Sequence, residues 1–116
     1  MSEWIEVARA AEIGPGRGRT VVAGVLRLAL FNDRGSFYAI DDVCPHQGAS
    51  LGEGLLHDGR VICPWHSWVF DLTTGQCPRG SHPGVRTYET RCAEGSVLVR
   101  VPADRAERTL NETEVS

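Results

Sequence analysis

The feature that most constrains how this 116-residue chain can fold is a pair of short cysteine–histidine boxes separated by sixteen residues. They read Cys44-Pro45-His46 and Cys63-Pro64-Trp65-His66. Each box places one thiol and one imidazole in a loop that follows a predicted strand. Two thiolates combined with two imidazoles suit either a tetrahedral zinc ion or an iron–sulfur centre. The fold must therefore bring two loops together.

The rest of the sequence predicts strands rather than helices. Gly, Asp, Asn and Pro interrupt it every several residues, and short apolar runs lie between these breaks. The expected strands are Trp4–Ala8, Thr20–Val22, Val25–Phe31, Ser36–Ile40, Leu55–Leu56, Val61–Cys63, Trp68–Leu72, Val85–Cys92 and Ser96–Val101. Turns are expected at 32–35 and 57–59, with a final hairpin around 93–95. This density of short strands predicts an all-β antiparallel sandwich or barrel.

Length and composition predict one globular domain. The chain is 41% hydrophobic and 23% charged, which is ordinary for a folded domain. A net charge of −3 gives no electrostatic footprint for nucleic acid. No apolar run is long enough to span a membrane, and the N-terminus does not resemble a secretion signal. We therefore expect a cytoplasmic protein with reduced cysteines.

The two boxes and their surroundings resemble the Rieske family, whose [2Fe–2S] cluster has two cysteines on one iron and two histidines on the other. Gly48 and Leu51 in the first loop fit this resemblance, as do 70–71 and 74–75 after the second. The resemblance implies one cluster per chain, with Cys44 and Cys63 on the inner iron and His46 and His66 on the outer one. It also implies a Rieske-type domain over 1–102, with a cluster-binding part at about 41–77 and a polar tail at 103–116.

The resemblance also identifies the surroundings of the cluster. The residues expected there are Pro45, Leu51, Pro64, Trp65, Ser67, Trp68 and Phe70. Respiratory Rieske proteins have a bracing disulfide at the positions occupied here by Ala49 and Trp65, so that disulfide cannot form. They also have a serine and a tyrosine where this chain has Trp68 and Phe70. Fewer hydroxyl donors to the cluster predict a reduction potential near the low end of the family's range.

In function, the resemblance implies a low-potential ferredoxin. Such a protein carries single electrons from a flavin-dependent reductase to a terminal oxygenase or another oxidoreductase, and is a monomer when alone and not itself an enzyme. An alternative from the same fold is the small subunit of an NADH-dependent nitrite reductase, which works with a large subunit. Two other interpretations of the boxes remain open: a structural zinc-binding interaction module, and a disulfide between Cys44 and Cys63.

The remaining candidate residues carry weaker signals. Cys77 and Cys92 are expected to be plain thiols, and His57 and His82 surface residues, although His82 could fall near the cluster. Four acids lie in the first loop and the segment after it, and Arg60 and Arg79 offset them only if the fold brings these arginines nearby. These acids suggest an acidic rim that would attract a basic partner surface: Asp41, Asp42, Glu53 and Asp58.

Overall fold

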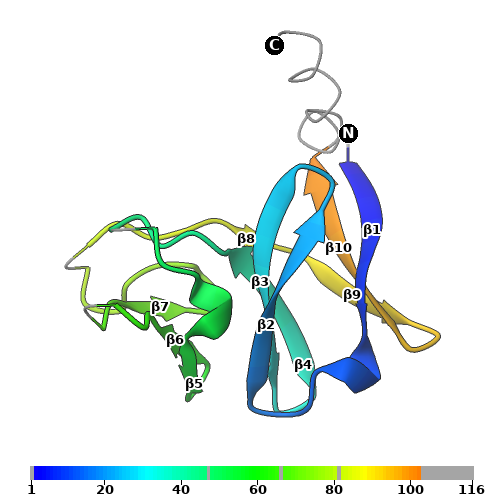
Figure 1. The fold of residues 1–116 in the computed structure, drawn as a ribbon, viewed down its shortest axis with the longest axis horizontal. Coiled ribbons are helices and arrows are strands. Elements are labelled where there is room, and N and C mark those ends of the chain that lie inside the picture. Colours follow the sequence, from blue (N-terminus) through cyan, green and yellow to red (C-terminus); the bar gives the residue numbers. More distant parts are fainter. Residues whose placement is uncertain (1, 47, 66, 81, 103–116) are drawn as a thin grey trace, which may run out of the picture.

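Three antiparallel sheets build the molecule. Two of them form a base, and the third, smaller sheet lies to one side of that base (Figure 1). The computed structural model describes residues 2–46, 48–65, 67–80 and 82–102. The base strands are β1 (Ser2–Arg9), β2 (Arg17–Ala23), β3 (Leu26–Asp33), β4 (Ser36–Asp41), β8 (Thr87–Tyr88), β9 (Thr90–Ala93) and β10 (Ser96–Pro102). The separate small sheet consists of β5 (Leu55–His57), β6 (Arg60–Ile62) and β7 (Val69–Asp71). Two 3₁₀ turns, η1 (Ala10–Glu12) and η2 (Leu51–Glu53), complete the described elements, so the all-β prediction is confirmed.

Three of the hairpins turn through a two-residue loop that ends in glycine. These loops are Arg34-Gly35, Asp58-Gly59 and Glu94-Gly95, and all six residues have positive φ. Two consecutive residues in the left-handed region match the type I′ turn, whose twist continues the twist of the flanking strands. The β2–β3 turn lies at Gly24-Val25, because Ala23 pairs with Leu26.

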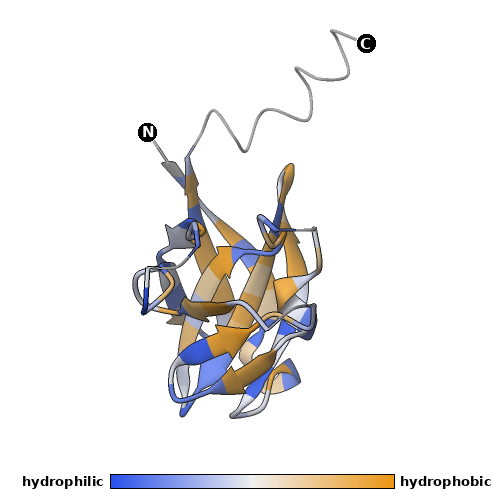
Figure 2. Ribbon diagram, turned by 90° about the vertical axis from the view of Figure 1, so that its left-hand side faces the viewer, coloured by the Kyte–Doolittle hydropathy of each residue, from blue (hydrophilic) through white to orange (hydrophobic). Residues whose placement is uncertain are grey.

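The base closes because the first and last strands pair with each other. Strand β1 runs antiparallel to β10, with Trp4 opposite Arg100. The resulting sheet, β1-β10-β9, packs against the sheet β2-β3-β4-β8 around an apolar core. Fully buried residues of this core include Leu28, Leu30, Val97 and Val99. Figure 2 shows the strands carrying most of the apolar residues.

One predicted strand is wrong in its extent. The segment Val85–Cys92 is divided into β8, which pairs with β4, and β9, which pairs with β10. The break comes at Glu89, where the chain leaves one sheet and enters the other. Apolar patterning cannot show this change, because each strand is short and only Tyr88 of the two strands lies in the core.

A second apolar cluster joins the base to the small sheet. Ala29, Phe31 and Ile40 come from β3 and β4, and they pack with Val61 and Phe70 of β6 and β7. Each of these five side chains is at most 1% exposed. The small sheet therefore has a fixed support beneath the two box loops.

The turn after β7 is stabilised by the carboxylate of Asp71. Its Oδ1 accepts hydrogen bonds from the Thr73 hydroxyl (2.5 Å), the Thr73 amide (2.8 Å) and the Thr74 amide (3.3 Å). These bonds, led by that of the Thr73 hydroxyl, lower the pKa of Asp71 from its ordinary value. Its stabilisation is thus complete above the ordinary pKa and is lost as the pH falls through the lowered one.

We expect Asp71→Asn to lower the unfolding free energy at neutral pH by at most about 1 kcal/mol, since this carboxylate is largely solvated. The difference between wild type and variant should shrink as the pH falls below about 4. Urea unfolding at a series of pH values measures both quantities. A difference that is independent of pH would show that the charge of Asp71 has no such role.

Candidate metal centre

The first box loop is folded back on itself by backbone hydrogen bonds. The Cys44 amide donates to the carbonyl of Ala49 (2.9 Å), and the Gly48 amide donates to the carbonyl of Cys44 (2.9 Å). Val43 and Ser50 form an isolated antiparallel bridge just outside this turn. The loop thereby buries the Cys44 side chain, which is 1% exposed, and leaves His46 on the surface.

The second box loop is closed in a similar way. The Cys63 amide donates to the carbonyl of Trp68 (2.7 Å), so the loop begins and ends at adjacent points. Cys63 is 2% exposed, whereas Pro64 and Trp65 lie at the surface. His66 lies outside the described residues.

The fold brings the thiols of Cys44 and Cys63 into contact beneath the two loops. Burial raises the pKa of Cys63, the neighbouring Cys44 thiol raises it further, and a hydrogen bond from the Trp65 backbone acts in the opposite direction. Both cysteines are free thiols, which contradicts the alternative of a disulfide between them. Two adjacent buried thiols, with an exposed imidazole two residues after the first of them, form a donor set that fits an iron–sulfur centre.

An aromatic stack continues from His46. The His46 and Trp68 rings are 4.5 Å apart at 14°, and the Trp68 and His82 rings are 4.1 Å apart at 9°. Two imidazoles this close to one indole cannot share a face, so Trp68 separates them. Phe70 meets His82 edge-on at 4.9 Å. The structure therefore places His82 one ring away from His46, in line with the sequence-based suggestion that it could fall near the cluster.

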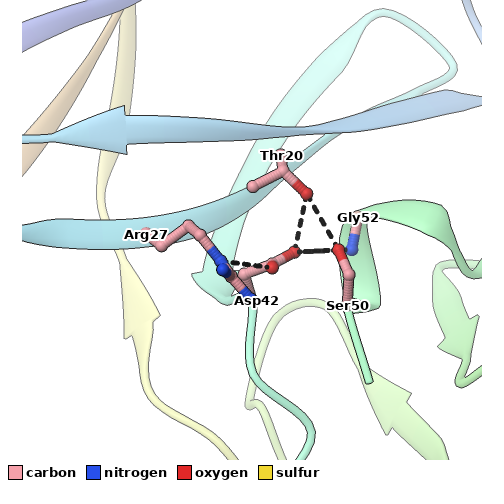
Figure 3. Close-up of polar contacts among 5 residues, drawn as sticks. All are labelled: Thr20, Arg27, Asp42, Ser50 and Gly52. Atoms are coloured by element: carbon pink, nitrogen blue, oxygen red, sulfur yellow. Dashed lines mark hydrogen bonds and ion pairs between the residues drawn. The ribbon is translucent and has the colours of Figure 1, made fainter. Parts of the chain in front are cut away.

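A buried carboxylate fixes the first box loop to the base (Figure 3). Asp42 Oδ1 accepts hydrogen bonds from the Thr20 hydroxyl (2.9 Å), the Ser50 hydroxyl (2.9 Å) and the Gly52 amide (2.8 Å). Its Oδ2 accepts one from Arg27 Nε at 3.0 Å. Thr20 and Arg27 belong to β2 and β3, whereas Ser50 and Gly52 belong to the loop. Asp42 thus joins the two parts of the fold.

The predicted acidic rim is wrong at Asp42, which is 0% exposed and paired with Arg27. Asp41 is also engaged: its carboxylate accepts hydrogen bonds from the Tyr88 hydroxyl (2.8 Å) and the Arg86 amide (3.0 Å). Only Glu53 and Asp58 of the four acids are exposed. No local pattern distinguishes Asp42 from Asp41, because both have partners in distant segments of the chain.

The residues expected around the cluster occupy different environments. Leu51 and Phe70 are 0% exposed and pack with Cys44 and Cys63 in the second apolar cluster. Pro45, Pro64, Trp65 and Ser67 are exposed, and Trp68 is half-buried. Ser67 has a φ of 57°, in the left-handed region that glycine adopts most easily.

Residues 3–92 match the Rieske [2Fe-2S] domain family. The chain belongs to this family. Rieske domains carry one [2Fe–2S] cluster, so this Rieske chain is a cluster-binding protein, and the donor set described above fits that cofactor. No helix in the described part of the chain is both long enough and apolar enough to cross a membrane.

The relatives of this Rieske chain differ in how much of their own length it covers. It is 41% identical to human apoptosis-inducing factor 3 over 97 residues, covering 81% of this chain but 16% of that protein. It is 34% identical to the anthranilate 1,2-dioxygenase ferredoxin subunit of Burkholderia cepacia, covering 87% of this chain and 94% of that subunit. Among solved structures, one from Mycobacterium tuberculosis described as an NADH-dependent nitrite reductase small subunit has a TM-score of 0.80 at 28% identity. That superposition covers 88% of this chain and 97% of the other. The chain therefore spans about a sixth of the first relative and nearly all of the other two.

Proposed function

We propose that Cys44, His46, Cys63 and His66 hold the cluster, with the cysteines on one iron and the histidines on the other. The contact between the two buried thiols supports this assignment, as does the position of His46 at the surface. By this proposal, residues 41–77 form the cluster-binding part of a domain spanning 1–102.

In this proposal the chain is an electron carrier rather than an enzyme by itself, and it works between a flavin-dependent reductase and a terminal oxygenase. When bound, the cluster takes up one electron and gives it back. The protein keeps the thiolate side of the site dry, because Cys44 and Cys63 are at most 2% exposed. It leaves the imidazole side accessible through His46, so that a partner can approach closely. The observation that carries the proposal is this division into a buried sulfur side and an exposed nitrogen side.

The dioxygenase ferredoxin subunit from Burkholderia, which this chain covers almost completely, supports the oxygenase assignment. The nitrite reductase small subunit supports a second candidate at a similar level of coverage. The two differ in association. We propose a carrier that is monomeric and cytoplasmic and meets its partners transiently. Gentle purification from the native cell should then yield it free, whereas a nitrite reductase subunit would co-purify with a large subunit.

We expect a reversible one-electron couple nearer about −150 mV than +300 mV, the two ends of the Rieske range. Trp68 and Phe70 offer no hydroxyl at the positions where respiratory relatives donate to the cluster, so the reduced state is less stabilised. Protein-film voltammetry on the purified protein measures the midpoint. A midpoint well above zero would contradict the low-potential assignment, and the absence of any reversible wave would contradict the carrier function.

A further inference from the structure

A pocket of about 410 Å³ opens beside the aromatic stack, on the side of Trp68 that carries His82. Ser67, Trp68 and His82 line it together with two arginines, Arg60 and Arg79. The pocket therefore lies one indole ring away from His46, the proposed cluster ligand. The cluster site described above does not account for two arginines at this pocket.

Neither arginine is held in a close ion pair. Both are exposed, and within the described ranges neither lies in an ion pair with a carboxylate. Arg60 lies opposite Asp71 in the β6–β7 pair and lowers the pKa of that carboxyl, so the charge of Asp71 offsets part of the charge of Arg60 and one positive charge remains. The chain as a whole has a net charge of −3, so the positive charge at this pocket is opposite in sign to that of the chain.

The pocket wall also holds an unused polar atom. The Nδ1 atom of His82 is hydrogen-bonded to the Pro83 carbonyl at 2.8 Å, and since a carbonyl only accepts, Nδ1 is the donor. The Nε2 atom on the other side of the ring is buried and has no hydrogen-bond partner among the described residues. With the proton on Nδ1, Nε2 of the neutral ring is an acceptor and is no contact for a carboxylate, so the case for an acidic ligand depends on the two arginines.

We propose that this pocket receives a carboxylate side chain from the surface of the protein with which the chain exchanges electrons. Guanidinium groups bind carboxylates with charge-assisted hydrogen bonds, and two of them at one pocket favour an acidic group strongly over a basic one. The inference rests on the proposed function and specifies the partner: its docking surface is acidic next to the redox centre. This is opposite in sign to the acidic rim predicted from the sequence.

Small oxidants of opposite charge test the sign of this surface without an identified partner. The dithionite-reduced protein is mixed with ferricyanide or with hexaammineruthenium(III) in a stopped-flow instrument, at ionic strengths from about 10 to about 500 mM. Local attraction makes the ferricyanide rate fall with salt, whereas a uniformly negative surface would make it rise. Millimolar hexaglutamate peptide should slow the ferricyanide reaction by competing for the pocket.

The decisive comparison is between the double variant Arg60→Gln/Arg79→Gln and the control variant Arg91→Gln. The control removes the same kind of charge from β9, on the far side of the base (Figure 1). The double variant should lose about three- to tenfold in ferricyanide rate at low salt and most of its inhibition by hexaglutamate. Arg91→Gln should resemble wild type in its ferricyanide rate and in its inhibition by hexaglutamate. Arg79→Gln alone, expected to show part of the effect, keeps the test valid if the loss of Arg60 disturbs the Asp71 turn.

Two failures can be told apart. A protein that contains no iron and sulfide would overturn the proposed function and this inference with it. A protein with its cluster intact whose double variant reacts with ferricyanide like the Arg91→Gln control, or whose ferricyanide rate rises with salt, would overturn the inference alone. The cluster content of every variant is therefore measured before its kinetics.

Discussion

Replacing Cys44 or Cys63 with alanine is expected to abolish the [2Fe–2S] cluster and to lower the unfolding free energy by roughly 3–5 kcal/mol or more. Both thiols are buried and in contact, so solvent is not in place to substitute for the missing ligand. Ligation joins two loops that lie on separate parts of the chain, and its free energy contributes directly to folding. Iron and sulfide content, visible absorption and urea unfolding measure the two losses.

Cys92→Ala is the matched control. Cys92 lies exposed on β9, and its removal should leave both the cluster and the unfolding free energy close to wild type. If Cys44→Ala or Cys63→Ala retained iron and sulfide at the wild-type level, the assignment of that cysteine would be wrong. If all three variants lost the cluster equally, general instability rather than lost ligation would be the cause.

The second large effect is expected at Asp42. In Asp42→Asn the Oδ1 position can still accept from Thr20, Ser50 and Gly52, but an amide NH₂ replaces the oxygen that faces Arg27. The new amide NH₂ and the Arg27 Nε–H are both donors, and they face each other at a position that is 0% exposed. We expect a loss of about 2–3 kcal/mol in unfolding free energy. Because Asp42 lies two residues before Cys44, we also expect faster cluster loss on mild heating.

Glu53→Gln provides the control for Asp42→Asn. It makes the same chemical change on an exposed side chain of the same loop, and should shift the unfolding free energy by less than about 0.5 kcal/mol. Urea unfolding of the cluster-containing proteins, with absorbance followed during heating, compares the two variants. Equal effects would show that the Asp42 network does not anchor the loop.

The fold class and the meeting of the two cysteine loops could be predicted because both depend on local signals. Glycine-containing turns divide the sequence into strands of the observed type, and two compact boxes mark the loops that carry Cys44 and Cys63. Strand ends were predicted less well, as at Val25, which belongs to a turn, and at Cys63, which follows β6 rather than ending it.

The features that position the site depend on contacts between distant segments. The pairing of β1 with β10 joins opposite ends of the chain, and the partners of Asp42 come from β2, β3 and the loop. His82 reaches Trp68 from a separate loop. No periodicity or spacing encodes such contacts, so a buried anchor such as Asp42 could not be distinguished in sequence from a surface acid.

The central claim is that two thiolates and two imidazoles of this chain hold a two-iron cluster that accepts one electron. Electron paramagnetic resonance of the natively prepared, dithionite-reduced protein tests it most directly. The account predicts a silent oxidised form and a reduced form with about one unpaired electron per chain, carrying hyperfine coupling to imidazole nitrogen. A colourless protein with stoichiometric zinc, no signal after reduction and no cluster after incubation with iron and sulfide would contradict it.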